Sequence, residues 1–234
     1  MSTPEWYRDE NFPAGVDYTD IAQVEVYDKR HQRFRDYEAF TDHIIESIGI
    51  QPDHTVIDLG AGTGAFVLNA ASRCKNIYAV DVSQTMLDYL RQKADAQGIE
   101  NIVYCHGGFL TYDHTTAPVD AVVSSAALHH LPDFWKLVGL RRVAQMIKTG
   151  GRLYLMDVVF SFAPEELHEH IDGWIDGFVK TVGEEFREEI VTHVRDEFST
   201  FDWVMEGILE RAGFRIDSIT VSDAFTSTYL CTRL

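Results

Sequence analysis

The chain has 234 residues, of which 45% are hydrophobic and 12% aromatic, which is enough apolar material for the core of one domain. Its 37 acidic and 20 basic residues give a formal net charge of −17. A surface with that excess repels the phosphates of nucleic acids and of anionic membranes, so neither is an expected partner.

The opening segment, MSTPEWYRDENF, has no basic stretch followed by an apolar run, and no part of the sequence approaches ~18 consecutive apolar residues. We therefore expect a cytoplasmic protein. Its cysteines, Cys74, Cys105 and Cys231, lie far apart and form no CxxC pair. Buried free thiols are expected from this spacing, rather than a metal or redox site.

Residues 1–50 are interpreted as an N-terminal helical flap. Prolines and a glycine interrupt the first 15 residues, whereas Asp20 to Ile48 is expected to be helical. One apolar stripe at three- and four-residue spacing supports the helix: Tyr37, Phe40, Ile44, Ile45 and Ile48. Gly49 is the expected end of the helix.

Residues 54–160 alternate short apolar runs with amphipathic segments. The apolar runs are expected to be strands: Thr55–Leu59, Ile77–Val80, Ile102–Cys105, Ala121–Ser124 and Arg152–Asp157. Helical patterns lie between them, near 64–73, 84–97 and 133–147. This alternation predicts an α/β fold with a doubly wound parallel sheet that helices cover on both faces.

The rest of the chain is expected to complete the same single domain, because no linker separates it from the core. Residues 161–200 are interpreted as a helical cap inserted after the fifth strand, and 201–234 as a C-terminal helix, near 202–212, and a strand pair. The two strands, Phe214–Val221 and Thr226–Thr232, are close enough in sequence to pair antiparallel at one edge of the sheet.

The most informative segment is VIDLGAGTG at residues 56–64, where an apolar strand enters a turn with glycine at every second position. Glycine allows positive φ and close approach of a ligand, and the helix that follows offers free N–H groups. A dinucleotide site would have G-x-G-x-x-G, whereas this turn has G-x-G-x-G with Asp58 before it. The combination favours a ligand that carries an ammonium group and no pyrophosphate.

Asp81 ends the second expected strand, 17 residues beyond Gly64. A carboxylate at that place can accept hydrogen bonds from both ribose hydroxyls of a nucleoside. Alternatively, Asp81 caps the helix that begins near Gln84, a role for which Ser83 is an equally good candidate.

Together these segments resemble the class I S-adenosylmethionine-dependent methyltransferases. VIDLGAGTG is similar to the first motif of that family and AVDVS (79–83) to the second. DAVVSSAALHHLPD (120–133) resembles the fourth-strand motif of the small-molecule, ubiquinone-biosynthesis-like branch, and RRVAQMIKTGGRLYLMDV (141–158) the helix, turn and fifth strand that follow. The resemblance implies a Rossmann-like, mostly parallel seven-stranded sheet with an antiparallel C-terminal strand. It also implies methyl transfer from S-adenosylmethionine to a small molecule, with S-adenosylhomocysteine as the product.

The resemblance further implies roles for individual residues. Asp58 would lie near the amino group of the cofactor, Asp81 would hold the ribose, and Val82 would pack on the adenine. The implied cofactor-binding set is Tyr27, Asp58, Gly60, Ala61, Gly62, Asp81, Val82, Gly108, Phe109 and Ser125. The family often places an acidic residue against the adenine amino group after the third strand, where this chain has Gly108. Backbone groups or Asp113 would then replace that residue.

Tyr27 belongs to the segment 20–28, which resembles a flap that covers the cofactor in the same branch. Tyr27 would be the residue of the flap nearest the ligand. The alternative is a core aromatic on a docking helix.

His129 and His130 follow the fourth expected strand, at the end of the sheet where parallel-sheet enzymes build their sites. Either could act as a base or orient an acceptor, so both are catalytic candidates, with a structural role as the alternative. Asp157, at the end of the fifth strand, is a further candidate for the cleft, with a cap of the following segment as the alternative. His168 and His170 point to different faces of one helix, so no metal is expected.

Small-molecule methyl transfer is thus the leading function. Its alternatives are an enzyme that uses the same cofactor for another reaction, a cofactor-binding regulatory protein without turnover, and a nicotinamide dehydrogenase, which the glycine spacing disfavours. Transfer to protein or nucleic acid is disfavoured by the charge and by SSAA at 124–127, where an NPPY-like tetrapeptide would stand. The sequence names neither the acceptor nor the oligomeric state.

The insertion at 161–200 is the expected determinant of acceptor choice, because it follows the fifth strand and could fold over the cleft. Four aromatic residues in and after it either line a lid or belong to the core: Trp174, Phe178, Phe186 and Trp203.

Overall fold

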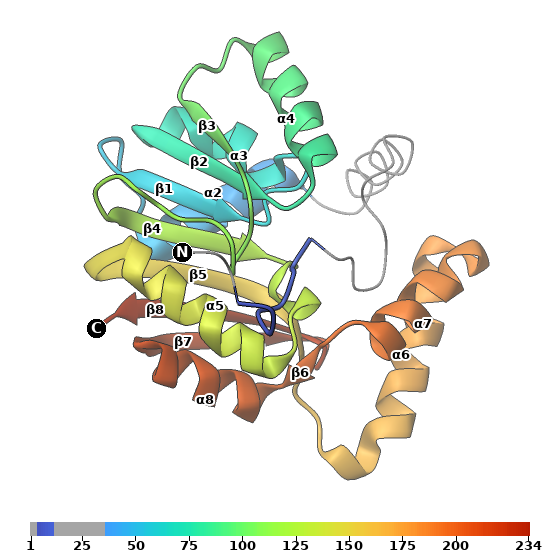
Figure 1. The fold of residues 1–234 in the computed structure, drawn as a ribbon. Helices are drawn as coiled ribbons and strands as arrows, with labels where there is room; N and C mark the ends of the chain where they lie inside the picture. The colour runs from blue at the N-terminus through green and yellow to red at the C-terminus, as the bar shows by residue number, and fades with distance from the viewer. Residues whose placement is uncertain (1–3, 12–35) are drawn as a thin grey trace.

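The computed structural model describes residues 4–11 and 36–234, and within them a twisted sheet lies between layers of helices (Figure 1). Seven strands follow the order β3-β2-β1-β4-β5-β8-β7. Their bounds are β1 Thr55–Leu59, β2 Asn76–Asp81, β3 Ile102–His106, β4 Val119–Ser125, β5 Ile147–Phe160, β7 Phe214–Ser222 and β8 Thr226–Arg233. The first five strands pair in parallel, and β8 pairs antiparallel with both β5 and β7. The expected fold class is therefore confirmed.

Two apolar layers hold the helices to the sheet. One layer joins the sheet to α2 (Tyr37–Ile48), α3 (Ala65–Ala70) and α4 (Gln84–Gln97), and the other joins it to α5 (Asp133–Met146) and α8 (Asp202–Ala212). Val56 belongs to the first layer and its neighbour Ile57 to the second, because successive side chains of a strand point to opposite faces. Both are fully buried, as expected for a parallel strand covered on both sides.

The helix ends follow the sequence signals closely. Ser83 is the N-cap of α4 and accepts a hydrogen bond from the Met86 N–H, so the capping role belongs to Ser83 and not to Asp81. Gly49 ends α2 and Gly213 ends α8, both with left-handed backbone. The expected helix from Asp20 to Ile48 lies partly outside the described residues, and its described part is α2.

Two details of the sheet differ from the expectation. β5 begins at Ile147 and includes the expected glycine turn, and its register with β4 shifts between Val119 and Ala121. The second difference is an unexpected strand, β6, Thr200–Phe201, which pairs in parallel with the end of β5. A two-residue strand is too short to produce an alternating pattern in the sequence.

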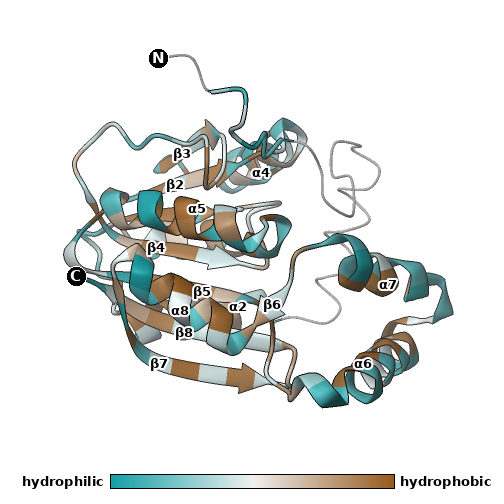
Figure 2. Ribbon diagram, turned by 60° about the horizontal axis from the view of Figure 1, so that its bottom comes forward, coloured by the Kyte–Doolittle hydropathy of each residue, from teal (hydrophilic) through white to brown (hydrophobic). Residues whose placement is uncertain are grey.

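The insertion after β5 is helical, as expected, and projects beyond the carboxyl ends of the strands (Figures 1 and 2). It consists of η3 (Pro164–Glu166), α6 (Leu167–Val182), η4 (Glu184–Phe186) and α7 (Arg187–Asp196). Trp174 of α6 stacks on Phe225, with ring centroids 4.6 Å apart, and so attaches the insertion to the β7–β8 turn. Trp203 lies on α8 instead and is 66% exposed, so it belongs neither to the core nor to the insertion.

In the part of the chain that the structure describes, no helix combines the length and the apolar character needed to cross a bilayer.

Candidate active site

The candidate site lies at the carboxyl ends of the parallel strands. β1 neighbours β2 on one side and β4 on the other, so the order of the strands along the chain reverses direction at β1. Such a switch point opens a crevice beyond the strand ends. The turn after β1 packs tightly against the turn after β4: a Cβ added at Gly60 would lie 2.3 Å from the Cβ of Ala127. The glycine at position 60 is therefore a packing requirement.

Glycine is required at the other two positions of the turn, 62 and 64, for different reasons. Gly64 has φ +86°, and a Cβ there would collide with Leu90. Gly62 has φ +53°, but a Cβ there would meet no atom of the described residues within 4 Å. Gly62 thus faces open space, which is what a turn that receives a ligand against its backbone requires.

Asp81 connects this turn to the end of β2. Its Oδ2 accepts a hydrogen bond from the Gly62 N–H and its Oδ1 from the Ser83 N–H, each at 2.8 Å. The side chain is buried, and burial raises its pKa more strongly than the two N–H donors and His106 lower it. Asp81 therefore stands beside the open face of Gly62 with a charge that the protein stabilises only in part.

Asp58 is the second carboxylate at this edge and is 3% exposed. Burial, followed by the charge of Asp81, raises its pKa to about 8. Two buried acidic groups whose pKa values are both raised make a site that a cationic ligand would stabilise. This electrostatic arrangement matches the sequence-based expectation of a ligand with an ammonium group.

The residues expected near an adenine ring lie on the other side of Asp81. Val82 is 38% exposed although apolar, and His106 contacts its carbonyl oxygen at 2.9 Å. Phe109 is buried in the core, so only its backbone is available to a ligand. Asp113, the expected substitute for an acidic residue at Gly108, is paired with Arg142 at 2.7 Å and is 80% exposed. The structure gives Asp113 no place in the site.

Ser125 and Tyr27 complete the expected cofactor-binding set. Ser125 ends β4, is half-buried, and lies opposite Met156 in the sheet register. Ala126 follows it with a positive φ of 53°, which turns the chain sharply at the strand end. Tyr27 lies outside the described residues.

His129 belongs to a buried charge network at the ends of β4 and β5. Its Nδ1 lies 2.5 Å from Asp157 Oδ1, while Asp157 Oδ2 accepts the N–H groups of Leu128 and His129 at 2.8 and 3.1 Å. On the other side, His129 Nε2 lies 3.4 Å from Glu197 Oε2, which also pairs with His193. The short helix η2 (Leu128–His130) is thus fixed by carboxylates from two other segments.

The pKa directions indicate the charge states in this network. Burial alone would lower the pKa of His129, but the charge and hydrogen bond of Asp157, together with Glu197, raise it. Burial would raise the pKa of Asp157, yet His129 and the Val158 N–H hold it below its usual value. The pKa of Glu197 is also lowered, against burial, by His193 and His129. His129 is therefore a buried imidazolium between two carboxylates.

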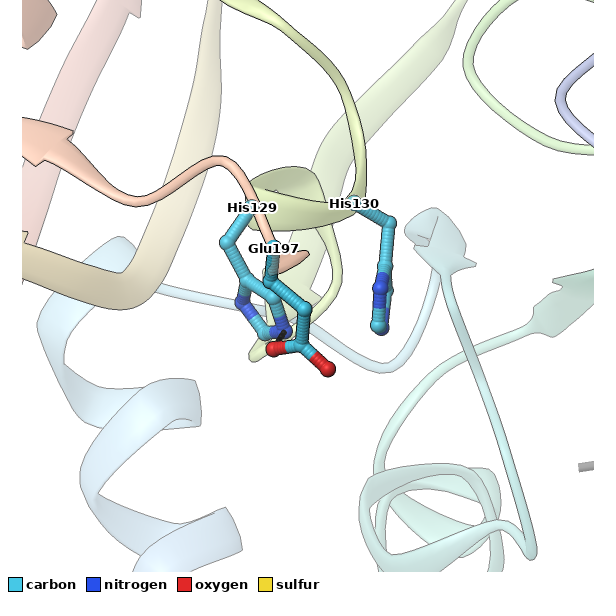
Figure 3. A group of neighbouring side chains, drawn as sticks. All are labelled: His129, His130 and Glu197. Carbon is cyan, nitrogen blue, oxygen red and sulfur yellow. Dashed lines mark ion pairs between the residues drawn. The ribbon is translucent and has the colours of Figure 1, made fainter. Parts of the chain in front are cut away.

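His130, the other catalytic candidate, lies next to His129 at a ring-centroid distance of 4.3 Å and is half-buried (Figure 3). One ligand atom each from His129, His130 and Glu197 can be chosen within 4.8 Å of one another, so these side chains have the spacing of a metal site. Both ring nitrogens of His129 already face carboxylates, however, and the absence of a metal stays a prediction. His168 and His170 are not members of this group.

Sequence reasoning missed Glu197 and Glu10. Glu197 approaches η2 from the end of the insertion, and Glu10 binds the N–H groups of Leu110 and Thr111. Both residues contact partners that are distant in the sequence, and no local pattern in the sequence indicates such a contact.

Comparisons with known proteins identify relatives of this chain. Residues 56–151 match a family described as "Methyltransferase domain". An uncharacterized methyltransferase of Geobacillus thermodenitrificans is 30% identical over 137 residues, which are 58% of this chain and 60% of that protein. The chain thus aligns with about three fifths of the length of that relative.

Solved structures show the same fold. An S-adenosylmethionine-dependent methyltransferase from Clostridium acetobutylicum superposes with a TM-score of 0.67 at 15% identity, covering 91% of this chain and 98% of that one. The cyclase SpnF superposes with a TM-score of 0.65 at 14% identity, covering 84% and 80%. Proteins described by different reactions therefore share this architecture, and the fold alone does not fix the reaction.

Proposed function

We propose that the chain is a class I S-adenosylmethionine-dependent methyltransferase, which transfers the methyl group of S-adenosylmethionine to a small-molecule acceptor and releases S-adenosylhomocysteine. The observation that carries the proposal is the open face of Gly62 beside the buried carboxylates of Asp58 and Asp81.

The residues present fit this cofactor. The open side of Gly62 leaves room for the methionine part. The raised pKa of Asp58 shows that its ionised form is poorly stabilised in the free protein, and the ammonium group of the cofactor would stabilise that form. Asp81 keeps acceptor capacity on both oxygens beyond its two backbone bonds, as a ribose diol requires. Exposed Val82 offers an apolar surface next to it for a base.

When bound, the cofactor supplies a methyl group already activated by the sulfonium charge. The protein then has to align acceptor and donor and to exclude water. Asp58, Gly62 and Asp81 would fix the donor, while the crevice beyond β4 and β5 would receive the acceptor. A base is needed only for an acceptor that is protonated in its resting form.

Between the two histidine candidates, His130 is the better placed to touch an acceptor. Both ring nitrogens of His129 face carboxylates, those of Asp157 and Glu197, and its pKa is raised by them, so neither nitrogen is free to take a proton from an acceptor. We assign to His129 the positioning of η2, and to His130 the contact with the acceptor. The insertion at 161–200 would complete the acceptor pocket and set its selectivity.

Small-molecule transfer is favoured over macromolecular substrates by the charge of −17, and this charge also argues for a cytoplasmic protein without nucleic-acid or membrane partners. A second candidate function, another reaction of the same cofactor, is favoured by the likeness to a cyclase. A cofactor-binding protein without turnover is the third.

Calorimetric titration with S-adenosylmethionine, S-adenosylhomocysteine and NAD tests the cofactor. Micromolar binding of the first two and none of NAD is the expected result, and binding of NAD alone would contradict the proposal. Methyl transfer is then tested with radiolabelled cofactor and a panel of small-molecule phenols, amines, thiols and carboxylic acids. Cofactor consumption with no labelled product would favour the other reaction types.

A further inference from the structure

The N-terminal segment 4–11 packs against the core next to the expected adenine site, beside α5 (Figure 1). Trp6 stacks on Trp135 of α5 at 6.4 Å, and Tyr7 meets the same ring edge-on at 4.9 Å. The Arg8 guanidinium lies over the Phe198 ring, 5.3 Å from its centroid. Three consecutive side chains thus fix the path of the segment that delivers Glu10.

Glu10 binds the turn after β3 with both carboxylate oxygens. Oε1 accepts the N–H groups of Leu110 and Thr111, at 2.9 and 2.6 Å, and the Thr111 hydroxyl at 2.5 Å. Oε2 accepts the Leu110 N–H at 3.0 Å. A carboxylate oxygen can accept more than one hydrogen bond, so Oε2 keeps acceptor capacity for a further donor.

Oε2 occupies the space that a side chain at position 108 would need. A Cβ added at Gly108 would lie 2.7 Å from Glu10 Oε2 and 2.8 Å from Val82 Cγ1. Position 108 therefore has no room for an acidic residue of its own while Glu10 is in place. The carboxylate stands beside Val82, the exposed apolar residue that directly follows Asp81 in the sequence.

Resting on the cofactor assignment above, we propose that Glu10 is a specificity-determining residue that recognises the exocyclic amino group of the cofactor's adenine. A nucleoside whose sugar is held by Asp81 and whose ring packs on Val82 would bring the edge of its base to Oε2. A carboxylate accepts a hydrogen bond from an aromatic amino group and repels a carbonyl oxygen at the same place. The N-terminal segment thus supplies from about 100 positions away along the chain the acidic group that Gly108 lacks.

If the ligand contacts Glu10, the ligand and the docked segment stabilise each other, because a coupling between two binding events is reciprocal. Removing the Glu10 contact should then affect the adenine-bearing ligand more than an analogue that cannot use it.

The test compares S-adenosylhomocysteine with S-inosylhomocysteine, which has a carbonyl in place of the amino group. Dissociation constants are measured by calorimetry for the full-length wild type, Glu10→Gln and Glu10→Ala. The wild type should prefer the adenine ligand by on the order of ten-fold or more. Both variants should lose most of this preference, and Glu10→Gln should bind the inosine ligand better than the wild type does, because its amide can donate to the carbonyl.

Glu5→Gln is the matched control, since it makes the same charge change on an exposed residue of the same segment and should keep the wild-type preference. Circular dichroism melting confirms that each variant is folded. An equal loss of affinity for both ligands, with the preference unchanged, would show that Glu10 only anchors the segment and would overturn the inference. A wild type that binds the adenine ligand without preference would overturn it too, whereas failure to bind either ligand would overturn the cofactor assignment itself.

Discussion

The raised pKa of Asp58 predicts that cofactor binding releases a proton. In the free protein this carboxyl has a pKa of about 8, so it is mostly protonated at pH 6. An ammonium group bound next to it would favour the ionised form and lower that pKa. Binding would then be coupled to loss of the Asp58 proton and should become tighter as the pH rises from 6 to 8.

The size of the effect follows from the pKa. With a free-protein pKa of about 8 and an ionised carboxylate in the complex, the ionised fraction of the free protein rises from about 1% at pH 6 to about half at pH 8. The dissociation constant of S-adenosylhomocysteine should fall by roughly 50-fold over that interval, or about 2 kcal/mol of binding free energy. At pH 7, about 0.9 of a proton should leave per ligand bound.

Isothermal calorimetry in phosphate and in Tris measures that proton directly, because the two buffers have different ionisation enthalpies. Asp58→Asn is the control: it should bind with a weaker pH dependence, since position 58 then has no proton to lose. A wild-type dissociation constant that is flat from pH 6 to 8, with no buffer dependence of the enthalpy, would refute the assignment of Asp58 to the ammonium site.

The same shift has a consequence for folding. Because the pKa of Asp58 is raised in the folded state, unfolding between the ordinary value of 3.8 and about 8 releases a proton. The contribution of this group to stability is therefore fully present below pH 3.8 and declines as the pH rises through about 8. Urea titrations at a series of pH values should show that the free energy of unfolding falls more steeply with rising pH for the wild type than for Asp58→Asn.

Three further predictions concern other parts of the site. Asp81→Ala should weaken S-adenosylhomocysteine binding by about 1–3 kcal/mol, through lost charge-assisted hydrogen bonds, and an unchanged dissociation constant would remove Asp81 from the ribose site. Gly62→Val should abolish binding in a protein that still melts cooperatively, because its side chain would enter the open space; full binding would place the ligand elsewhere. Asp157→Asn should lower the free energy of unfolding by about 3–5 kcal/mol in urea titrations near pH 6. In the wild type, the stabilisation by the Asp157–His129 pair should decline as the pH rises through the raised pKa of His129. It should also decline as the pH falls through the lowered pKa of Asp157. A variant as stable as the wild type would contradict the buried pair.

The first four parallel strands, β1 to β4, could be predicted nearly to the residue because burial on both faces leaves a continuous apolar run, bounded by turn residues, whereas β5 extends beyond its expected bounds at both ends. β1 agrees at both ends, and β2, β3 and β4 differ from the expectation by one or two residues at an end. The glycine turn and Asp81 could also be predicted, since both lie on one short stretch of chain. Local sequence carries enough information when the chemistry is local.

Glu10 and Glu197 could not be predicted for the opposite reason. Each is an acidic residue in a polar segment of a strongly acidic chain, and it differs from its neighbours only through contacts made in the folded protein. Glu197 meets His129 across 68 positions, and Glu10 meets Leu110 across 100. Only the topology brings such pairs together, so these contacts require the structure.

The buried network also connects the insertion to the end of β4 where the catalytic candidates stand. The Phe198 N–H donates to the carbonyl oxygen of His129 at 2.8 Å, and the fully buried Lys136 bonds the Phe198 carbonyl oxygen. Glu197 adds its carboxylate to His129 from the same short segment. Breaking these contacts would leave buried charges and backbone groups unpaired, so the segment after α7 is held firmly against η2. α6 is held less firmly to the rest of the protein, because it has no buried residue. An acceptor that displaces the cap should therefore move α6 around this fixed point and leave His129 and His130 in place.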